Sequence, residues 1–208
     1  KFGDGPAAIN LLHEIGKRTP LGHILGQGAQ FTGEAYGVTR IPTVNRQSMP
    51  AYEPRAVKGI GVTYITTPMG ADHTAGYTIA PEILAVGGKA EPLSTKDKIG
   101  LSKAFQQTTA FIDAAGYCLF IAFPILDIPT GFDGVVETVN AMLGTSYTSA
   151  DVTKIGDEIL RLERDFNLRA GIGKEADRPP EFMRYEKLPP HNHVWDIPDA
   201  ELDSFWDK

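Results

Sequence analysis

The feature that most constrains the fold is a stripe of apolar residues that steps by three and four positions along residues 150–168. The stripe consists of Val152, Ile155, Ile159, Leu162 and Phe166. This spacing is typical of an amphipathic helix with one buried face. Alternation of apolar and polar residues with a period of two, which marks a half-buried strand, is almost absent from the chain. The sequence therefore predicts an all-α, multihelical fold.

Weaker patterns of the same kind predict further helices. The expected ranges are 6–18, 22–36, 55–64, about 95–115 and 133–143. The apolar residues expected on the buried side of the fourth helix are Ile99, Leu101, Ala104, Phe105, Ala110 and Phe111. Beyond Gly173 the chain is rich in proline and charge, which predicts an extended tail on the surface. The proline-punctuated stretch 37–53 predicts a boundary near residue 42, with one domain over 1–42 and another over 43–208.

Charge and composition exclude several kinds of partner. The formal net charge is −6 and no basic run is present, so we expect no nucleic acid partner, because phosphate binding needs clustered Lys and Arg. The longest apolar run covers about ten residues, 117–126, too few to span a bilayer, so no membrane partner is expected. The one cysteine, Cys118, allows no internal disulfide and favours a reducing, cytoplasmic compartment.

Two side chains are candidates for chemistry, each with a structural alternative. Cys118 stands among apolar residues, where a lone cysteine is usually an inert core residue. Its functional interpretation is a ligand of a metal or an iron–sulfur cluster, to which it would give one of the usual four thiolates. His73 lies in a loop of small residues. It is either a hydrogen-bonded structural histidine or a proton partner that titrates near neutral pH.

Two further motifs carry weaker signals. His191 and His193, one residue apart in the proline-rich tail, have the geometry to chelate a metal, but such tails usually carry solvated histidines. Glu53 and Arg55 flank a proline and predict either a local ion pair at a turn or a contact to a phosphate-bearing cofactor.

Taken together and in order, several motifs resemble those of the aldehyde:ferredoxin oxidoreductase family of tungsten bis-pterin enzymes. Residues 50–55 read Pro-Ala-Tyr-Glu-Pro-Arg, residues 70–73 read Gly-Ala-Asp-His, and residues 113–118 read Asp-x-x-Gly-Tyr-Cys. Residues 162–171 carry Leu-Glu-Arg-Asp-Phe-Asn-Leu-Arg-Ala-Gly, which is similar to the family's Glu-Arg-x-Phe-Asn-x-Arg-x-Gly segment. The resemblance covers essentially the whole chain and indicates the C-terminal part of such an enzyme.

The resemblance implies a set of cofactors in the parent enzyme. Family members hold tungsten, or molybdenum, between two pterin cofactors next to a 4Fe-4S cluster. By this likeness Asp113 and Tyr117 contact one pterin, and Cys118 is the fourth cluster thiolate. A carboxylate at the pterin and a thiolate at the cluster, carried on one short segment, would fix the distance between the two cofactors.

The resemblance also implies a reaction and its partners. The parent enzyme would oxidise a small aldehyde to a carboxylic acid with water and pass the electrons through the cluster to ferredoxin. His73 would lie beside the metal and hydrogen-bond the substrate, as a catalytic residue. The backbone of Ala75 and Gly76 would lie near the cofactor.

Three positions depart from the family pattern. Tyr117 stands where leucine is usual, Glu53 where aspartate is usual, and Asp72 where many members have cysteine. These departures keep two alternatives open: a related tungsten subunit of the aromatic thioester reductase type, and a helical scaffold without catalytic function.

The remaining cluster cysteines and the domain that cradles the bis-pterin are expected in N-terminal domains of the same parent chain. We therefore expect the 208-residue chain by itself to be inactive and to hold no tungsten, pterin or cluster.

Overall fold

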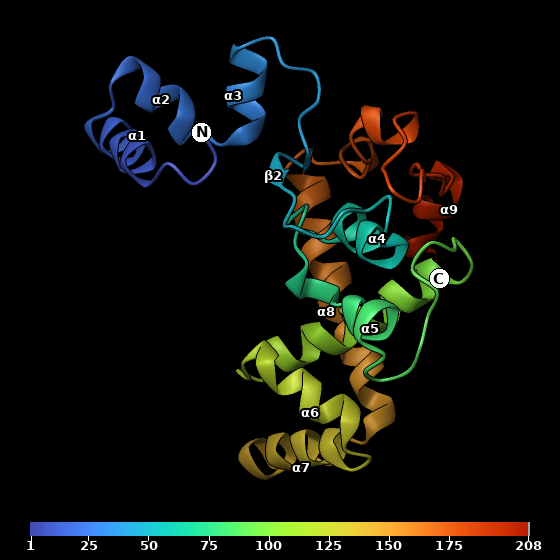
Figure 1. Cartoon of the computed structure of the whole chain (residues 1–208). Helices are drawn as coiled ribbons and strands as arrows, with labels where there is room; N and C mark the ends of the chain where they lie inside the picture. Colours follow the sequence, from blue (N-terminus) through green and yellow to red (C-terminus); the bar gives the residue numbers. More distant parts are fainter. Residues whose placement is uncertain (208) are drawn as a thin grey trace.

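The computed structural model describes residues 1–207 and is built almost entirely from helices (Figure 1). The α-helices are α1 (Gly5–Lys17), α2 (Pro20–Gly26), α3 (Ala29–Ala35), α4 (Lys58–Thr66), α5 (Lys98–Ala114), α6 (Ala122–Asp127), α7 (Gly131–Leu143), α8 (Ser149–Arg169) and α9 (Asp199–Asp203). The short 3₁₀ segments are η1 (Thr74–Gly76), η3 (Leu119–Ile121), η4 (Lys174–Ala176), η5 (Glu181–Arg184) and η6 (Ser204–Trp206), and η2 (Ala80–Leu84) is a π-helix. The predicted all-α class is confirmed.

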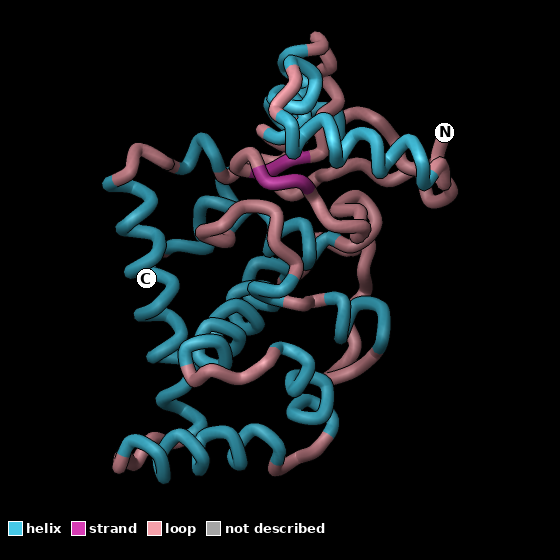
Figure 2. Tube along the Cα trace, turned by 90° about the vertical axis from the view of Figure 1, so that its left-hand side faces the viewer, coloured by secondary structure: helices cyan, strands magenta, loops and turns pink. Residues whose placement is uncertain are grey.

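The first three helices lie together beside the rest of the chain (Figure 1). α1 buries no residue, and the predicted single helix over 22–36 is divided into α2 and α3. The division falls at Gly28, whose φ of +90° an α-helix cannot contain. A two-residue hairpin, β1 (Thr43–Val44) paired with β2 (Gln47–Ser48), lies between these helices and the following ones (Figure 2). The domain boundary near residue 42 remains a prediction.

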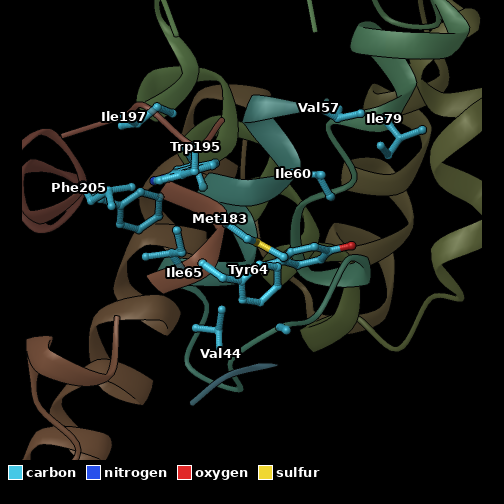
Figure 3. Packing of buried hydrophobic residues seen from close by; sticks show 14 residues of the cluster. Val44, Val57, Ile60, Tyr64, Ile65, Ile79, Met183, Trp195, Ile197 and Phe205 are labelled. Carbon is cyan, nitrogen blue, oxygen red and sulfur yellow. The ribbon is translucent and has the colours of Figure 1, made fainter. Parts of the chain in front are cut away.

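We call the larger hydrophobic cluster the first core; it forms around α4. Every residue of α4 is buried, and side chains from the end of the chain close over it. Figure 3 shows Met183, Trp195 and Phe205 packed against Ile65 of α4. The prediction of a surface tail after Gly173 is therefore wrong, because aromatic and aliphatic residues of this segment are buried in the first core.

A smaller second core joins α5, α7 and α8. Its buried members are Phe111, Val135, Val136 and Val152. α7 matches its predicted range closely at both ends. Large apolar side chains nearby remain in contact with solvent, among them Phe120 at 80% exposure and Met142 at 79%. The second core is therefore much less complete than the first.

α8 crosses α5 at very short range. A Cβ at Gly156 would lie 1.9 Å from the carbonyl oxygen of Gln107, so only glycine permits this backbone contact. The buried line of α8 runs through Val152, Gly156 and Leu160. Two predicted core positions are therefore wrong: Leu162 is 71% exposed and Phe166 is 72% exposed. The crossing at Gly156 turns these side chains away from α5.

Within residues 1–207, none of the helices combines the length and the apolar character needed to cross a bilayer.

Candidate functional site

The central helix α5 buries a polar face. Lys98, Ser102, Gln106 and Thr109 are all buried, at spacings of three and four residues. The apolar positions predicted for the buried side are mostly only half-buried or exposed, and Phe111 alone among them is fully buried. That prediction was wrong because α4 packs against α5 through threonine hydroxyl groups, which form hydrogen bonds with the polar face of α5.

The end of α5 brings two of the candidate residues close to the same surface. Gly116 adopts a φ of +77°, and the N–H of Tyr117 donates to the carbonyl of Ile112 at 3.1 Å. A left-handed residue with this bond is a common way to end a helix. Asp113 therefore lies in the last turn of α5, and Cys118 follows directly after the reversal.

A cavity of about 390 Å³ brings together His73, Asp113 and Cys118. We call it the aromatic cavity because rings make up most of its large side chains. Those rings are Tyr52, Tyr77, Phe105, Phe120 and Phe123. Cys118 is exposed, so its thiol is accessible rather than an inert core group. The structure thus places the imidazole, the carboxylate and the thiol around one cavity.

His73 is held among aromatic rings. Its ring centroid lies 5.5 Å from that of Tyr52 and 6.0 Å from that of Tyr77. The hydroxyls of the two tyrosines are hydrogen-bonded at 2.7 Å. Burial, together with the hydrogen bond to Tyr52, raises the pKa of Tyr77 to about 12. The buried Nδ1 atom of His73 has no hydrogen-bond partner within residues 1–207 and lies 4.0 Å from Oδ1 of Asp72.

Tyr52 and Tyr77 are site residues that sequence reasoning missed. Tyr52 belongs to the motif at residues 50–55, in which the charged neighbours Glu53 and Arg55 give the stronger sequence signal. Only the fold shows that the chain brings Tyr52 beside Tyr77 and His73.

A second cavity, of about 290 Å³, shares Thr109 and Asp113 with the aromatic cavity. We call it the acidic cavity because Asp72, Asp113 and Glu163 line it, together with Gln106. Burial and the negative charge of Asp72 raise the pKa of Asp113. Burial and the charge of Asp113 raise the pKa of Glu163. Asp113 lines both cavities, so one carboxylate faces both spaces.

The remaining predicted cofactor contacts fall in different places. Ala75 lines the acidic cavity. Gly76 is buried, and a Cβ there would lie 2.7 Å from Cγ of Gln106, so it makes room for that side chain. The ring of Tyr117 packs against the second core. A cofactor contact at Tyr117 would therefore use the backbone, and the leucine-to-tyrosine departure is accommodated by the core.

The two weaker motifs take structural roles. Arg55 donates to both carboxylate oxygens of Glu53 at 2.9 Å and to the carbonyl of Glu186 at 2.8 Å, which matches the local ion pair predicted as the alternative. His193 pairs with Leu188 in an isolated bridge, and His191 is exposed. In the described part of the chain, no group of three or more His, Cys, Asp or Glu side chains is arranged to hold a metal ion.

Fold and site together define an all-α chain with a ligand cavity walled by an imidazole, a carboxylate and a thiol. Residues 1–207 match the family model described as aldehyde ferredoxin oxidoreductase, domains 2 and 3. The chain belongs to this family.

Curated relatives support the same conclusion. The chain is 37% identical over 193 residues to the tungsten-containing aldehyde ferredoxin oxidoreductase of Pyrococcus horikoshii, covering 91% of this chain and 31% of that protein. It is 39% identical over 179 residues to the protein of the same name from Pyrococcus furiosus, covering 85% of this chain and 29% of the relative. The chain thus spans about a third of the length of these relatives and corresponds to their C-terminal part.

Proposed function

We propose that the chain is the C-terminal part of a tungsten-pterin aldehyde:ferredoxin oxidoreductase. The observation that carries this proposal is the aromatic cavity, whose wall contains His73, Asp113 and Cys118 although they lie far apart in the sequence. The relatives named above are tungsten-containing enzymes by name. When bound, a tungsten-pterin centre supplies the oxidation of an aldehyde to an acid, and a 4Fe-4S cluster carries the electrons to ferredoxin.

The residues present fit the part of these cofactors that one chain segment could hold. Cys118 offers one accessible thiol, which suits a single cluster ligand, with the other thiolates coming from elsewhere. Asp113 presents an acceptor for N–H groups of a pterin ring, and Asp72 and Glu163 line the same acidic cavity. A wall of acceptors is the chemistry that a ring rich in N–H donors requires.

His73 is proposed as the proton partner and orienting group for the substrate. Its imidazole lines the aromatic cavity, and Nδ1 lies 4.0 Å from Oδ1 of Asp72, so a carboxylate stands beside the proposed proton partner. The linked hydroxyls of Tyr52 and Tyr77 stand beside the imidazole and can donate a hydrogen bond to a carbonyl oxygen.

The aromatic wall also favours a second candidate. Five aromatic side chains line a cavity of about 390 Å³, which would suit a planar aromatic substrate. A related tungsten subunit that reduces aromatic thioesters is therefore an alternative within the same family. A substrate screen with the complete enzyme separates the two, since only one of them turns over simple aldehydes.

The test of the proposed function is Cys118→Ser in the complete chain. Cluster iron per protein should fall by about twofold or more, because a hydroxyl is a poor replacement for the thiolate. Stability of the helical fold should change by less than about 0.5 kcal/mol, as at other exposed positions. Ala122→Ser, in the same cavity, is the matched control and should leave the iron unchanged. Equal iron content in Cys118→Ser and wild type would contradict the assignment.

A further inference from the structure

A third cavity, of about 130 Å³, lies between α5 and α6. We call it the apolar pocket. It shares part of its wall with the aromatic cavity, through Phe105, Thr109, Ala122 and Leu126. The remaining residues of its wall are Ala104, Thr108, Ile112 and Ile125. Because the two cavities have these wall residues in common, the apolar pocket is a side branch of the aromatic cavity.

The wall of the apolar pocket carries no charged side chain. It is aliphatic or aromatic except for two threonines, and the hydroxyl of Thr108 already donates to the carbonyl of Ala104 at 2.9 Å. The imidazole, carboxylate and thiol of the site line the aromatic cavity and not this branch. A charged group that entered the apolar pocket would lose water without gaining a partner. The branch therefore suits a hydrocarbon group.

Two contacts place the aliphatic side chains of α6 in the wall of the pocket. Ile125 packs against the second core. Gly87, at a φ of +69°, brings its backbone so close to Leu126 that a Cβ there would lie 2.9 Å from Cδ2 of the leucine. The apolar pocket is thus bounded by side chains that belong to the packing of the fold.

One tyrosine ring lies between the imidazole and the residues at the entrance of the apolar pocket. The ring centroid of Tyr77 lies 6.0 Å from that of His73 and 5.8 Å from that of Phe123. Phe123 directly follows Ala122, which lines both cavities with a single methyl group. A carbonyl group beside His73 would therefore need a tail of several carbon atoms to enter the pocket.

We propose that the apolar pocket binds the uncharged hydrocarbon tail of the aldehyde substrate, and that Ala122 is a specificity-determining residue at its entrance. This inference rests on the proposed function, under which the carbonyl group of the aldehyde lies beside His73. It narrows the substrate class to aldehydes with an apolar tail longer than the methyl group of acetaldehyde. Each methylene of the tail that is buried should raise kcat/KM by about fourfold.

The test compares three aldehydes on the complete enzyme, prepared with its cofactors. Wild-type enzyme should oxidise hexanal with a kcat/KM about 15-fold or more above that for acetaldehyde, as expected when about two of the additional methylenes are buried. Succinic semialdehyde, whose tail ends in a carboxylate, should have a kcat/KM about tenfold or more below that for hexanal, because its charge would lose water in the pocket.

Ala122→Leu should reduce the preference for the longer tail. A leucine at the entrance fills the connection between the two cavities, so the ratio of kcat/KM for hexanal to kcat/KM for acetaldehyde should fall by about tenfold. This ratio does not depend on the fraction of enzyme that carries cofactors. Ala141→Leu, the same substitution at an exposed position of α7 outside both cavities, is the matched control and should keep the wild-type ratio.

A second variant covers the case in which Ala122→Leu does not fold. Thr108→Asp, at a half-buried position of α5, places a carboxylate in the wall of the apolar pocket and should lower the same ratio by about tenfold. Thr108→Val keeps the shape of the side chain without the charge and should lower the ratio much less than Thr108→Asp.

Failure of this inference can be told apart from failure of the proposed function. Complete enzyme that oxidises hexanal and acetaldehyde equally well would overturn this inference and leave the proposed function standing. An unchanged ratio in folded Ala122→Leu, or in Thr108→Asp where Ala122→Leu does not fold, would do the same. Complete enzyme that oxidises no aldehyde would overturn both.

Discussion

The two hydrophobic cores differ in how firmly they hold the residues around the site. The first core surrounds α4, in which all nine residues are buried, and takes in aromatic anchors from the end of the chain. The second core has four buried residues and leaves large side chains such as Phe120 and Met142 in solvent. The dense packing of the first core predicts high local stability, and the sparse packing of the second predicts easier local opening.

Both cores contribute to the same cavities. Gln106 is held to α4 by a hydrogen bond to Thr66, whereas Cys118 follows α5 next to the second core. Asp113 lies in the last turn of α5, just after Phe111 of the second core. The comparison suggests that the wall of the site beside the first core is rigid and that the wall beside the second core is adaptable. Three variants test it, in order of expected effect.

The largest effect is expected at the buried ion pair beside the first core. Lys98 Nζ contacts Glu82 Oε1 at 2.5 Å, and both residues are buried. Lys98→Met leaves the carboxylate without its partner and should lower the free energy of unfolding by about 3–5 kcal/mol, measured in urea. The double variant Lys98→Met with Glu82→Gln should recover much of this loss, since the amide oxygen can still accept from Gly59 N–H. A loss below about 1 kcal/mol would show that this region tolerates local rearrangement.

A smaller and local effect is expected in the second core. Val136→Ala removes two methyl groups from a buried position and should cost about 1–2 kcal/mol. Amide hydrogen exchange should accelerate in α7 and in residues 117–127 but not in α4. Val139→Ala, at a half-buried position on the same helix, provides a milder comparison. Equal acceleration in α4 would mean that the two cores open as one unit, and the proposed division would be wrong.

The smallest effect is expected at Asp113, in the last turn of α5. Its pKa is raised in the folded chain by burial and by Asp72, so folding binds protons and stability falls as pH rises from the ordinary carboxyl pKa through the raised one. Asp113→Asn should therefore stabilise the cofactor-free chain at pH 7, by about 0.5 kcal/mol or less because the residue is exposed. The gain should vanish below about pH 4, where the carboxyl is protonated in both states.

Thermal unfolding at pH 7 and pH 3.5 measures this difference. Asp127→Asn, at an exposed position outside both cavities, is the control. A destabilised Asp113→Asn chain at pH 7 would show that the carboxylate makes a favourable contact and would contradict the expected sign of the effect.

Long periodic segments were the most predictable part of the fold. α8 was expected over 150–168 and runs over Ser149–Arg169, because its apolar spacing is sustained and Thr148 with Asp151 forms a capping box at its start. Short segments were missed, including α9 and the π-helix η2, because a few residues carry no detectable period. The burial of Trp195 and Phe205 depends on distant α4, which local composition does not reveal.

The site residues that belong to sequence motifs were predictable. Those that reach the site only through the packing of distant segments were not. His73, Asp113 and Cys118 were selected through the family resemblance, and they do share a cavity; their chemical roles remain predictions. The buried polar face of α5 could not be seen, because a search for apolar periodicity passes over Ser102 and Gln106. Such conflicts between local pattern and fold are expected at functional sites. The signal in the sequence that could have indicated this face was the set of polar residues at helical spacing in α5, together with the threonines of α4.

Because glycine has no side chain, Gly156 also affects how the acidic cavity would respond to a bound ligand. Because the backbones of α5 and α8 touch at Gln107 and Gly156, the two helices cannot move closer together at this point. Ile159 and Glu163 on one helix therefore face Asp113 on the other across a gap whose width is set before anything binds. A ring entering this gap meets a preorganised slot, so little of its interaction energy is lost to rearranging the protein.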